Sequence, residues 1–377
     1  MEKDKIKSEK KETKKNINVK INDWVVEHLT RISVNDKIFF LDHLRTMFHA
    51  GLSLVEALHV LSKESENPRL KKIIEQIKIE TEKGKQFSDV LEKFPKVFPP
   101  IYVKMIASGE ISGKLEESLE QIVNQMKKNN ELTSSIKGAM IYPAVIIFAI
   151  SVVAIIMVTV VLPQLMTLFD EMATELPLPT RVLIAITNFM SNPINLIVIV
   201  VLIIIFIISF VQLLRKSLVF KTTIHKINLH IPIFGGVIKQ INLARFSLTL
   251  SSLLRSTLPI VEAVDITAET CSNKIYQNAL KDASEKIKKG INLSTVLEGY
   301  SKLFPPMVTE MIMVGEKTGE IERLLSELSN FYSDEVDKTM KNFSTIIEPA
   351  IILILGVAVA MIAMAVIMPM YSMVDSF

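Results

Sequence analysis

The chain has 377 residues, of which 49% are apolar and 22% charged, and its formal net charge is +3. A chain with this composition must keep its apolar and its charged segments apart along the sequence. Its only cysteine, Cys271, excludes an intrachain disulfide and a cysteine-based metal site, and it suits a reducing compartment.

Residues 1–35 form a lysine-rich N-terminal arm. The first twenty residues hold eight lysines and four acids, a local net charge of +4. Because no apolar stretch follows these lysines, we expect a solvated arm rather than a cleaved signal peptide. Contact of the arm with anionic lipid is the alternative. The rest of the chain carries a net charge of about −1 with mixed signs, which argues against a nucleic-acid partner.

Residues 36–140 have the pattern of a helical domain. The pattern predicts helices over residues 36–50, 54–65, 69–83, 88–94, 100–108 and 114–137. Stop or turn signals separate these helices at Gly51, Asn67-Pro68, Gly84, Pro95 and residues 109–113. Short helices at this density predict a compact α-bundle with a single core.

Three uncharged apolar runs predict transmembrane helices. The first fills the nineteen positions between Pro143 and Pro163, and at about 1.5 Å per residue it covers roughly 28 Å of bilayer. The second and third runs cover residues 194–214 and 350–368. We place the spans at residues 141–163, 193–214 and 348–369.

Basic residues at the boundaries predict the orientation of the spans. Lysines precede the first and third spans, and arginine and lysines follow the second, so these three flanks are expected in the cytoplasm. The connection 164–192 and the tail 370–377 are then external. An amphipathic helix in that connection, after Leu176-Pro177-Leu178-Pro179-Thr180, is expected to lie on the outer surface. The N-terminus is expected inside and the C-terminus outside.

The chemistry-bearing residue types argue against catalysis and coupled transport. The six histidines show no metal-ligand spacing, and no nucleophile motif is present. We therefore predict no enzymatic activity, no cofactor and no metal site. The spans contain no Asp, Glu, Lys, Arg or His, which disfavours a pump or coupled transporter.

A large internal repeat relates the two halves of the chain. Phe98-Pro99-Pro100 recurs as Phe304-Pro305-Pro306, an offset of 206 residues, and the same offset carries Pro143 to Pro349 and Pro163 to Pro369. Each copy is thus a soluble domain plus the span that follows it. The second span has no counterpart and returns the chain to the cytoplasm, so the repeat is parallel. Phe98 and Phe304 are expected to be equivalent core anchors.

The predicted fold class is an all-α membrane protein. Two homologous cytoplasmic six-helix bundles, residues 36–140 and 215–347, are joined to three transmembrane helices.

The motif Gly-Glu-x-x-Gly also occurs twice, and two interpretations of it stay open. It is present as Gly109-Glu110-Ile111-Ser112-Gly113 and as Gly315-Glu316-Lys317-Thr318-Gly319. In the first interpretation it is a turn between helices, with glycines at positive φ and the glutamate favouring the N-terminus of the following helix. In the second, Glu110 and Glu316 present an exposed acid to a partner protein or a divalent cation, although one carboxylate makes a poor metal site.

A third acidic candidate, Glu348, stands directly before Pro349 at the predicted membrane boundary, where the first copy has Tyr142. It either caps the start of the span at the headgroup level or accepts a cationic group of a membrane-bound client.

Taken together, the duplicated Phe-Pro-Pro and Gly-Glu-x-x-Gly blocks, the Leu-Pro-x-Pro-Thr segment and the order of the spans resemble the F or PilC family. These are inner-membrane platform proteins of type II secretion and type IV pilus systems. The resemblance covers nearly all of residues 36–377. It implies a bacterial cytoplasmic (inner) membrane location at the base of a pilus or pseudopilus. It also implies contact with a hexameric cytosolic ATPase, with pilin or pseudopilin subunits, with other inner-membrane assembly proteins and with further copies of the chain.

A membrane-anchored scaffold or signalling protein outside this machinery is the alternative, because it would share the topology. Within the resemblance, we expect the first domain to be the main docking surface for the ATPase. It is tethered to the membrane at one end only, whereas the second domain is tethered at both.

Overall fold

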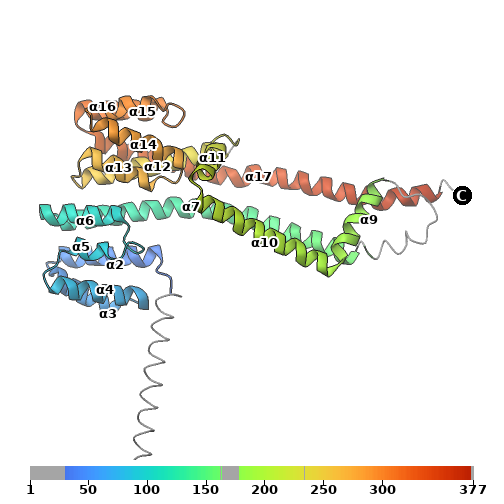
Figure 1. Ribbon diagram of the computed structural model, residues 1–377, viewed down its shortest axis with the longest axis horizontal. Coiled ribbons are helices and arrows are strands. Elements are labelled where there is room, and N and C mark those ends of the chain that lie inside the picture. The colour runs from blue at the N-terminus through green and yellow to red at the C-terminus, as the bar shows by residue number, and fades with distance from the viewer. Residues whose placement is uncertain (1–29, 162, 164–177, 233, 375–377) are drawn as a thin grey trace, which may run out of the picture. The chain divides into compact units, whose positions relative to one another are not determined.

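The computed structural model describes residues 30–161, 163, 178–232 and 234–374. Within these ranges the secondary structure is helical and contains no strand, which confirms the predicted all-α class (Figure 1). The chain divides into two compact units. Unit 1 holds Met1–Glu131 with Asn242–Tyr332, and unit 2 holds Leu132–Ile241 with Ser333–Phe377.

The first half of unit 1, called repeat 1 below, is a bundle of short helices. Helices α2 to α5 lie together in Figure 1. The helices are α2 (Val34–His49), α3 (Leu54–Glu64), α4 (Pro68–Glu82), α5 (Phe87–Glu92), α6 (Pro100–Ser112) and the first part of α7 (Leu115–Ile156).

Side-chain caps explain where these helices begin. Ser33 and Asp36 form a capping box at the start of α2, and Ser53 and Glu56 form one at the start of α3. Asn67 accepts hydrogen bonds at the start of α4, with proline at its first position. These caps satisfy backbone donors that a helix start otherwise leaves unpaired.

The second half of unit 1, repeat 2, contains the same helices again. They are the last part of α12 (Phe234–Arg255), α13 (Ile260–Thr270), α14 (Lys274–Ile287), α15 (Leu293–Glu298), α16 (Pro306–Thr318) and the first part of α17 (Ile321–Val374). Both bounds of α13, α15 and α16 lie 206 residues after those of α3, α5 and α6. The offset found in the sequence is therefore an offset between matching helices.

An aromatic cluster forms the centre of each repeat. Phe98 is 1% exposed and lies 5.9 Å from Phe40, between ring centroids. Phe304, also 1% exposed, lies 5.3 Å from Phe246 and 5.4 Å from Tyr276. Offset and edge-on packing at these distances adds to the burial of the rings. The two phenylalanines thus hold equivalent core positions.

Unit 2 contains the apolar segments. Three stretches among the described residues are long and apolar enough to cross a membrane, and they match the three predicted spans. They lie within Leu115–Ile156, Ile197–Lys216 and Ile321–Val357. The remaining elements of this unit include the π-helix η1 (Met157–Val161), α9 (Leu178–Ser191), α10 (Pro193–Lys216) and α11 (Leu218–Asn228).

The predicted external connection is only partly described. Its predicted amphipathic helix corresponds to α9, whereas residues 164–177 and most of the lysine-rich arm lie outside the described ranges.

In each repeat the last helix of the bundle continues into the apolar segment. Helix α7 continues through Pro143, and α17 continues through Pro349, so neither proline separates a domain from its span. A proline inside a helix removes one backbone hydrogen bond and adds a local clash, and a long helix absorbs this as a bend. Helix α6 extends to Ser112, four residues beyond its predicted end.

Candidate partner-binding surfaces

Glu110, the acid of the first Gly-Glu-x-x-Gly motif, lies inside α6 and points at the start of α5. Its carboxylate accepts hydrogen bonds from the backbone N–H groups of Phe87, at 2.6 Å, and Ser88, at 2.9 Å, and from the Ser88 hydroxyl. Gln86, which precedes α5, makes no side-chain capping bond to the described residues. Glu110 therefore supplies the cap that α5 lacks locally, and its negative charge suits a helix N-terminus.

Glu316 does the same in repeat 2. Its carboxylate accepts from the backbone N–H groups of Leu293, at 2.6 Å, and Ser294, at 3.3 Å, and from the Ser294 hydroxyl. The expectation that each glutamate favours the following helix is therefore wrong. Each acts on a short helix that precedes it in the sequence, because the fold brings the two together.

The two glycines of the motif have different roles, and only the second one forms a turn. Gly113 and Gly319 have φ values of 72° and 79°, and each ends its helix in the left-handed conformation. Gly109 is helical, and a Cβ there would lie 2.3 Å from the Ser118 hydroxyl oxygen. At Gly315 a Cβ would lie 2.6 Å from the Cα of Ile321. The first glycine is thus needed for close helix packing.

Because their oxygens bind backbone groups, Glu110 and Glu316 have a role inside the fold, and their predicted contact with a partner stays a prediction. The side chain of Ile111 in the first motif faces solvent and is 82% exposed. The equivalent position in repeat 2 is the exposed Lys317.

The remaining predicted motif residues have clear positions. Pro99 and Pro305 precede α6 and α16, and Pro100 and Pro306 occupy the first position of these helices. Glu348 is exposed and lies within α17, far from the start of that helix. It therefore caps no helix start, and its contact with a client stays a prediction.

Within unit 1, the two repeats contact each other through an interface that the sequence did not reveal. Lys104 of α6 pairs with Glu262 of α13. The Ser108 hydroxyl donates to the Ser256 carbonyl at 2.8 Å. These contacts, with those of α7 below, define the intrachain interface.

Helix α7 adds two contacts to the intrachain interface. The Gln125 amide donates to the Thr249 hydroxyl at 3.4 Å, and Lys128 donates to the Asn330 side chain at 2.8 Å. Gln125 is 4% exposed, so repeat 2 removes it almost completely from solvent.

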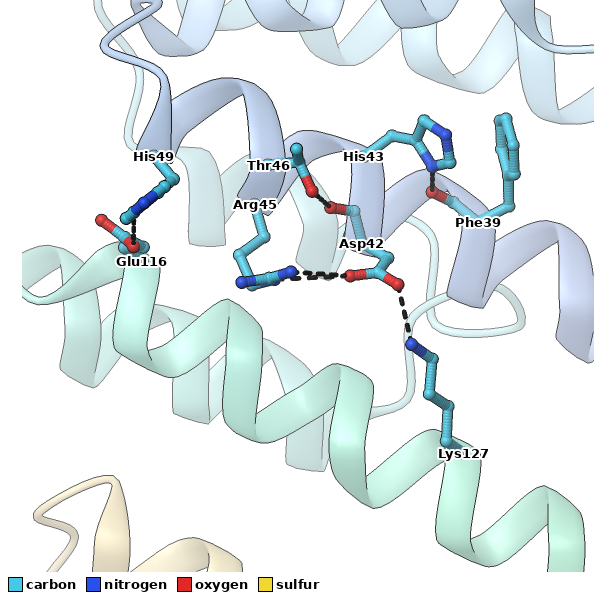
Figure 2. A network of polar contacts seen from close by, with 8 residues as sticks. All are labelled: Phe39, Asp42, His43, Arg45, Thr46, His49, Glu116 and Lys127. Carbon is cyan, nitrogen blue, oxygen red and sulfur yellow. Dashed lines mark hydrogen bonds and ion pairs between the residues drawn. The ribbon is translucent and has the colours of Figure 1, made fainter.

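A charged network ties α2 to α7 within repeat 1 (Figure 2). Asp42 accepts from Lys127 at 2.8 Å and from Arg45 at 3.2 Å. The hydrogen bond from Lys127 is the main reason that the pKa of Asp42 lies below its usual value. The pair His49–Glu116, at 2.6 Å, recurs at the same offset as Arg255–Glu322, at 2.5 Å.

Neither repeat offers an obvious metal site. No group of three or more His, Cys, Asp or Glu residues that could hold a metal ion occurs among the described residues. Burial raises the pKa of the Cys271 thiol to about 12, so this cysteine is a poor nucleophile at neutral pH.

Comparison with known proteins identifies the repeat. The family described as Type II secretion system (T2SS), protein F matches residues 40–163 and again residues 246–369. The two matches differ by the same 206 residues that relate the helices of the two repeats, and each includes a bundle and an apolar segment. The chain belongs to this family. It is a multi-pass membrane protein, and as a member of this family it is not an enzyme.

Curated relatives match over most of their length. The chain is 33% identical to the type IV pilus assembly protein PilC of Thermus thermophilus, over 91% of this chain and 84% of the relative. It is 34% identical to the PilC protein of Myxococcus xanthus, over 90% and 80%. It is 29% identical to the type II secretion system protein F of Vibrio cholerae, over 91% and 83%.

Proposed function

We propose that this chain is an inner-membrane platform for the assembly of a type IV pilus or a type II secretion pseudopilus. The observation that carries the proposal is the tandem match: two copies of the protein F domain, each of which includes a helical bundle and an apolar segment. Relatives named for pilus assembly and for secretion both match along the chain. The alternative of an unrelated scaffold or signalling protein has no comparable support.

A platform of this kind couples a cytosolic ATPase to the extraction of pilin or pseudopilin subunits from the membrane and to their insertion into the fibre. The bundles supply the polar surface for the ATPase, and the apolar helices supply the surface for the membrane-bound subunits. The basic flanks support an N-terminus in the cytoplasm and a C-terminus outside. The remaining candidate, Glu348, would accept a cationic group of such a subunit at the membrane boundary.

The main ATPase contact is assigned to repeat 1. Ile111 is the most exposed of the large apolar side chains among the described residues, and it lies at the end of α6 beside the helix turn at Gly113. A single exposed apolar side chain is common on protein surfaces, so the assignment rests on the single membrane tether of repeat 1, and Ile111 is the position at which a bound partner is detected. At the equivalent position, repeat 2 carries a charged lysine, so the two surfaces differ where a partner would touch them.

The test places a photoreactive amino acid at position 111 or at the matched position 317 of the full-length protein, in cells that contain the cognate ATPase. We expect an ATPase adduct from position 111 in clear excess over position 317. An adduct only from position 317 would reverse the assignment of the repeats. If the ATPase forms no adduct from any exposed position of either repeat, the platform function itself is wrong.

Glu110 and Glu316 are secondary contact candidates. Replacing Glu110 by glutamine keeps the shape of the side chain and its acceptor oxygen while it removes the charge. If Glu110→Gln folds normally and still gives the adduct from position 111, the carboxylate has only its role as the cap of α5.

A further inference from the structure

The two repeats contact each other through faces that are not equivalent. Each repeat therefore also carries the equivalent of the face that the other repeat uses. Repeat 1 uses the outer side of α6 and α7, with Lys104, Ser108 and Gln125; we call this the α6/α7 face. Repeat 2 uses chiefly the outer side of α12 and α13, with Thr249 and Glu262; we call this the α12/α13 face. Asn330 of α17, which accepts from Lys128, adds a contact outside this face. The contact is therefore head-to-tail rather than symmetric.

The offset of 206 residues places an equivalent of each face on the other repeat. The equivalent of the α6/α7 face lies on repeat 2; it is called the α16/α17 face and consists of Met307, Glu310, Val314 and Phe331. The equivalent of the α12/α13 face lies on repeat 1; it is called the α2/α3 face and consists of Phe39, His43, Ala50 and Glu56. Within the part of the chain that the structure describes, the residues named for the α16/α17 and α2/α3 faces are exposed, except for His43, which is half-buried.

The open α16/α17 face is more apolar than its covered equivalent. Gln125, 4% exposed, corresponds to Phe331, 44% exposed. Ile101, 7% exposed, corresponds to Met307, 39% exposed. Ser108 corresponds to the exposed Val314. Apolar side chains that gather on one open face mark an interaction site.

The open α2/α3 face likewise carries aromatic residues where the covered α12/α13 face carries polar ones. Arg245, which lines a cavity of the intrachain interface, corresponds to Phe39, an exposed phenylalanine. Thr249, the hydrogen-bond partner of Gln125, corresponds to His43, whose ring stacks on Phe39 with centroids 3.8 Å apart (Figure 2). The polar pair Gln125–Thr249 of the covered interface thus becomes the aromatic pair Phe331–His43 on the open faces.

We propose that the α16/α17 face of one chain docks on the α2/α3 face of a second copy, in the same way that repeat 1 docks on repeat 2 within the chain. The argument is continuity with the intrachain interface: the same helices are present at the same offset. At three positions a polar residue of the covered interface corresponds to an exposed apolar residue: Ser108 to Val314, Gln125 to Phe331 and Arg245 to Phe39. Each chain offers one face of each kind, so the contacts connect successive copies head-to-tail, either as a ring or as an open chain.

One pair of acidic residues would repel each other across the proposed interface between two copies. The ion pair Lys104–Glu262 corresponds to two acids, Glu310 and Glu56, which would face each other across the new interface. The Glu56 carboxylate also accepts from the Ser53 backbone N–H at 3.0 Å, which holds it at the start of α3. Like charges at this position weaken the association of two copies, and Glu310→Lys would restore the arrangement of the intrachain pair.

The first test is disulfide formation between full-length chains in membranes. Two differently tagged chains are co-expressed, both with Cys271→Ala, one with His43→Cys and the other with Phe331→Cys. We expect a mixed-tag dimer on mild oxidation, at a yield several-fold above a control pair in which Ile111→Cys replaces His43→Cys. Ile111 is exposed but belongs to neither face.

The other outcomes of this test overturn the proposal. Dimers formed by His43→Cys alone, or by Phe331→Cys alone, would show a symmetric interface. A mixed yield equal to the control would show that the two faces do not meet. If the cysteine at position 43 resists alkylation but gives no mixed dimer, the α2/α3 face is covered by something other than a second copy, such as the N-terminal arm.

The second test measures association of the purified protein in detergent by native mass spectrometry. We expect Glu310→Lys to raise the association constant about tenfold, because it removes a repulsion and adds an ion pair. We expect Phe331→Asp to lower the association constant. Both positions are exposed, so the folded state of either variant can be checked by its melting temperature. Equal association of the wild type, Glu310→Lys and Phe331→Asp would overturn the proposal, whether or not the ATPase binds.

Discussion

At the scale of single residues, the Gly-Glu-x-x-Gly motif holds three helices together: α5, α6 and α7. The glutamate of α6 caps α5, and the first glycine allows α7 to approach. The sequence showed that the motif recurs, and it predicted the left-handed glycine at its end. It could not show the partner of the glutamate, because the capped residues lie 22 and 23 positions upstream and only the completed fold brings them near.

Removing the Glu110 cap of α5 is expected to lower the stability of repeat 1. Helix α5 has six residues, too few to be stable without tertiary contacts, so the loss of its cap should be felt. We expect Glu110→Ala to lower the free energy of unfolding of repeat 1 by about 1–2 kcal/mol, measured by urea denaturation of residues 1–137. Glu117→Ala, which removes an exposed acid of α7, is the control. Equal effects of the two substitutions would contradict the capping role.

Replacing a packing glycine by alanine is expected to destabilise the fold by an amount that depends on the atoms next to the new methyl group. In Gly315→Ala the methyl group meets the backbone of Ile321, which cannot move without shifting α17. We expect a loss of roughly 1–3 kcal/mol and a lower melting temperature of the full chain. Gly138→Ala is the control, since its methyl group would have no described atom within 4 Å. A neutral Gly315→Ala would show that α16 and α17 are not held at this distance.

At the scale of elements, the sequence predicted most helices of repeat 1 because their caps are local. Serine, asparagine and proline at the helix starts are visible without any tertiary information. The predicted helix ends were wrong where a residue type that commonly ends helices is instead required for packing inside one. Gly109 was predicted as a helix stop, yet it lies inside α6. The intrachain interface was missed for the same reason, because surface residues such as Lys104 and Gln125 carry no local signal of a distant partner.

The aromatic centres predict equal losses in the two repeats. Phe98→Ala and Phe304→Ala each remove a fully buried ring, and we expect each to cost about 3–5 kcal/mol. The measurement is the unfolding of each repeat in the full chain, followed by limited proteolysis in increasing urea. Phe39→Ala, at an exposed ring of α2, is the control. A loss under about 1 kcal/mol for either buried ring would show that it is not a core anchor.

The network between α2 and α7 predicts an effect at acid pH. The pKa of Asp42 is lowered in the folded state, chiefly by the hydrogen bond from Lys127. Its contribution to stability is therefore complete above its unfolded pKa of about 3.9 and is lost as the pH falls through the lower folded value. We expect Lys127→Met to move the acid unfolding midpoint of residues 1–137 upward, as followed by circular dichroism. Lys114→Met, which removes a more exposed lysine, should leave the midpoint in place.

At the scale of the whole molecule, the offset of 206 residues was the most informative feature of the sequence. It was found from a few short motifs, and it recurs in the helix bounds and in the two family matches. The orientation of the chain in the membrane was derived from the charges at the span boundaries, and it stays a prediction.

Cysteine labelling tests that orientation. We expect a membrane-impermeant thiol reagent to reach cysteines placed at Glu175 or Asp375 in intact cells, and to reach those at Lys85 or Lys289 only after the cells are opened. The native Cys271 gives little background, because it is buried and burial raises its pKa to about 12. Labelling of position 85 or 289 in intact cells would reverse the topology.

The absence of a break at Pro143 and Pro349 has a mechanical consequence. Helix α7 has 42 residues and α17 has 54, a backbone length of about 60–80 Å, and in neither helix does a loop separate the bundle residues from the apolar residues. The backbone hydrogen bonds of a continuous helix resist bending, whereas a flexible linker of the same length does not. Each proline removes one of these bonds and so provides a point of compliance. In each repeat the proline is therefore the position at which the helix bends most easily.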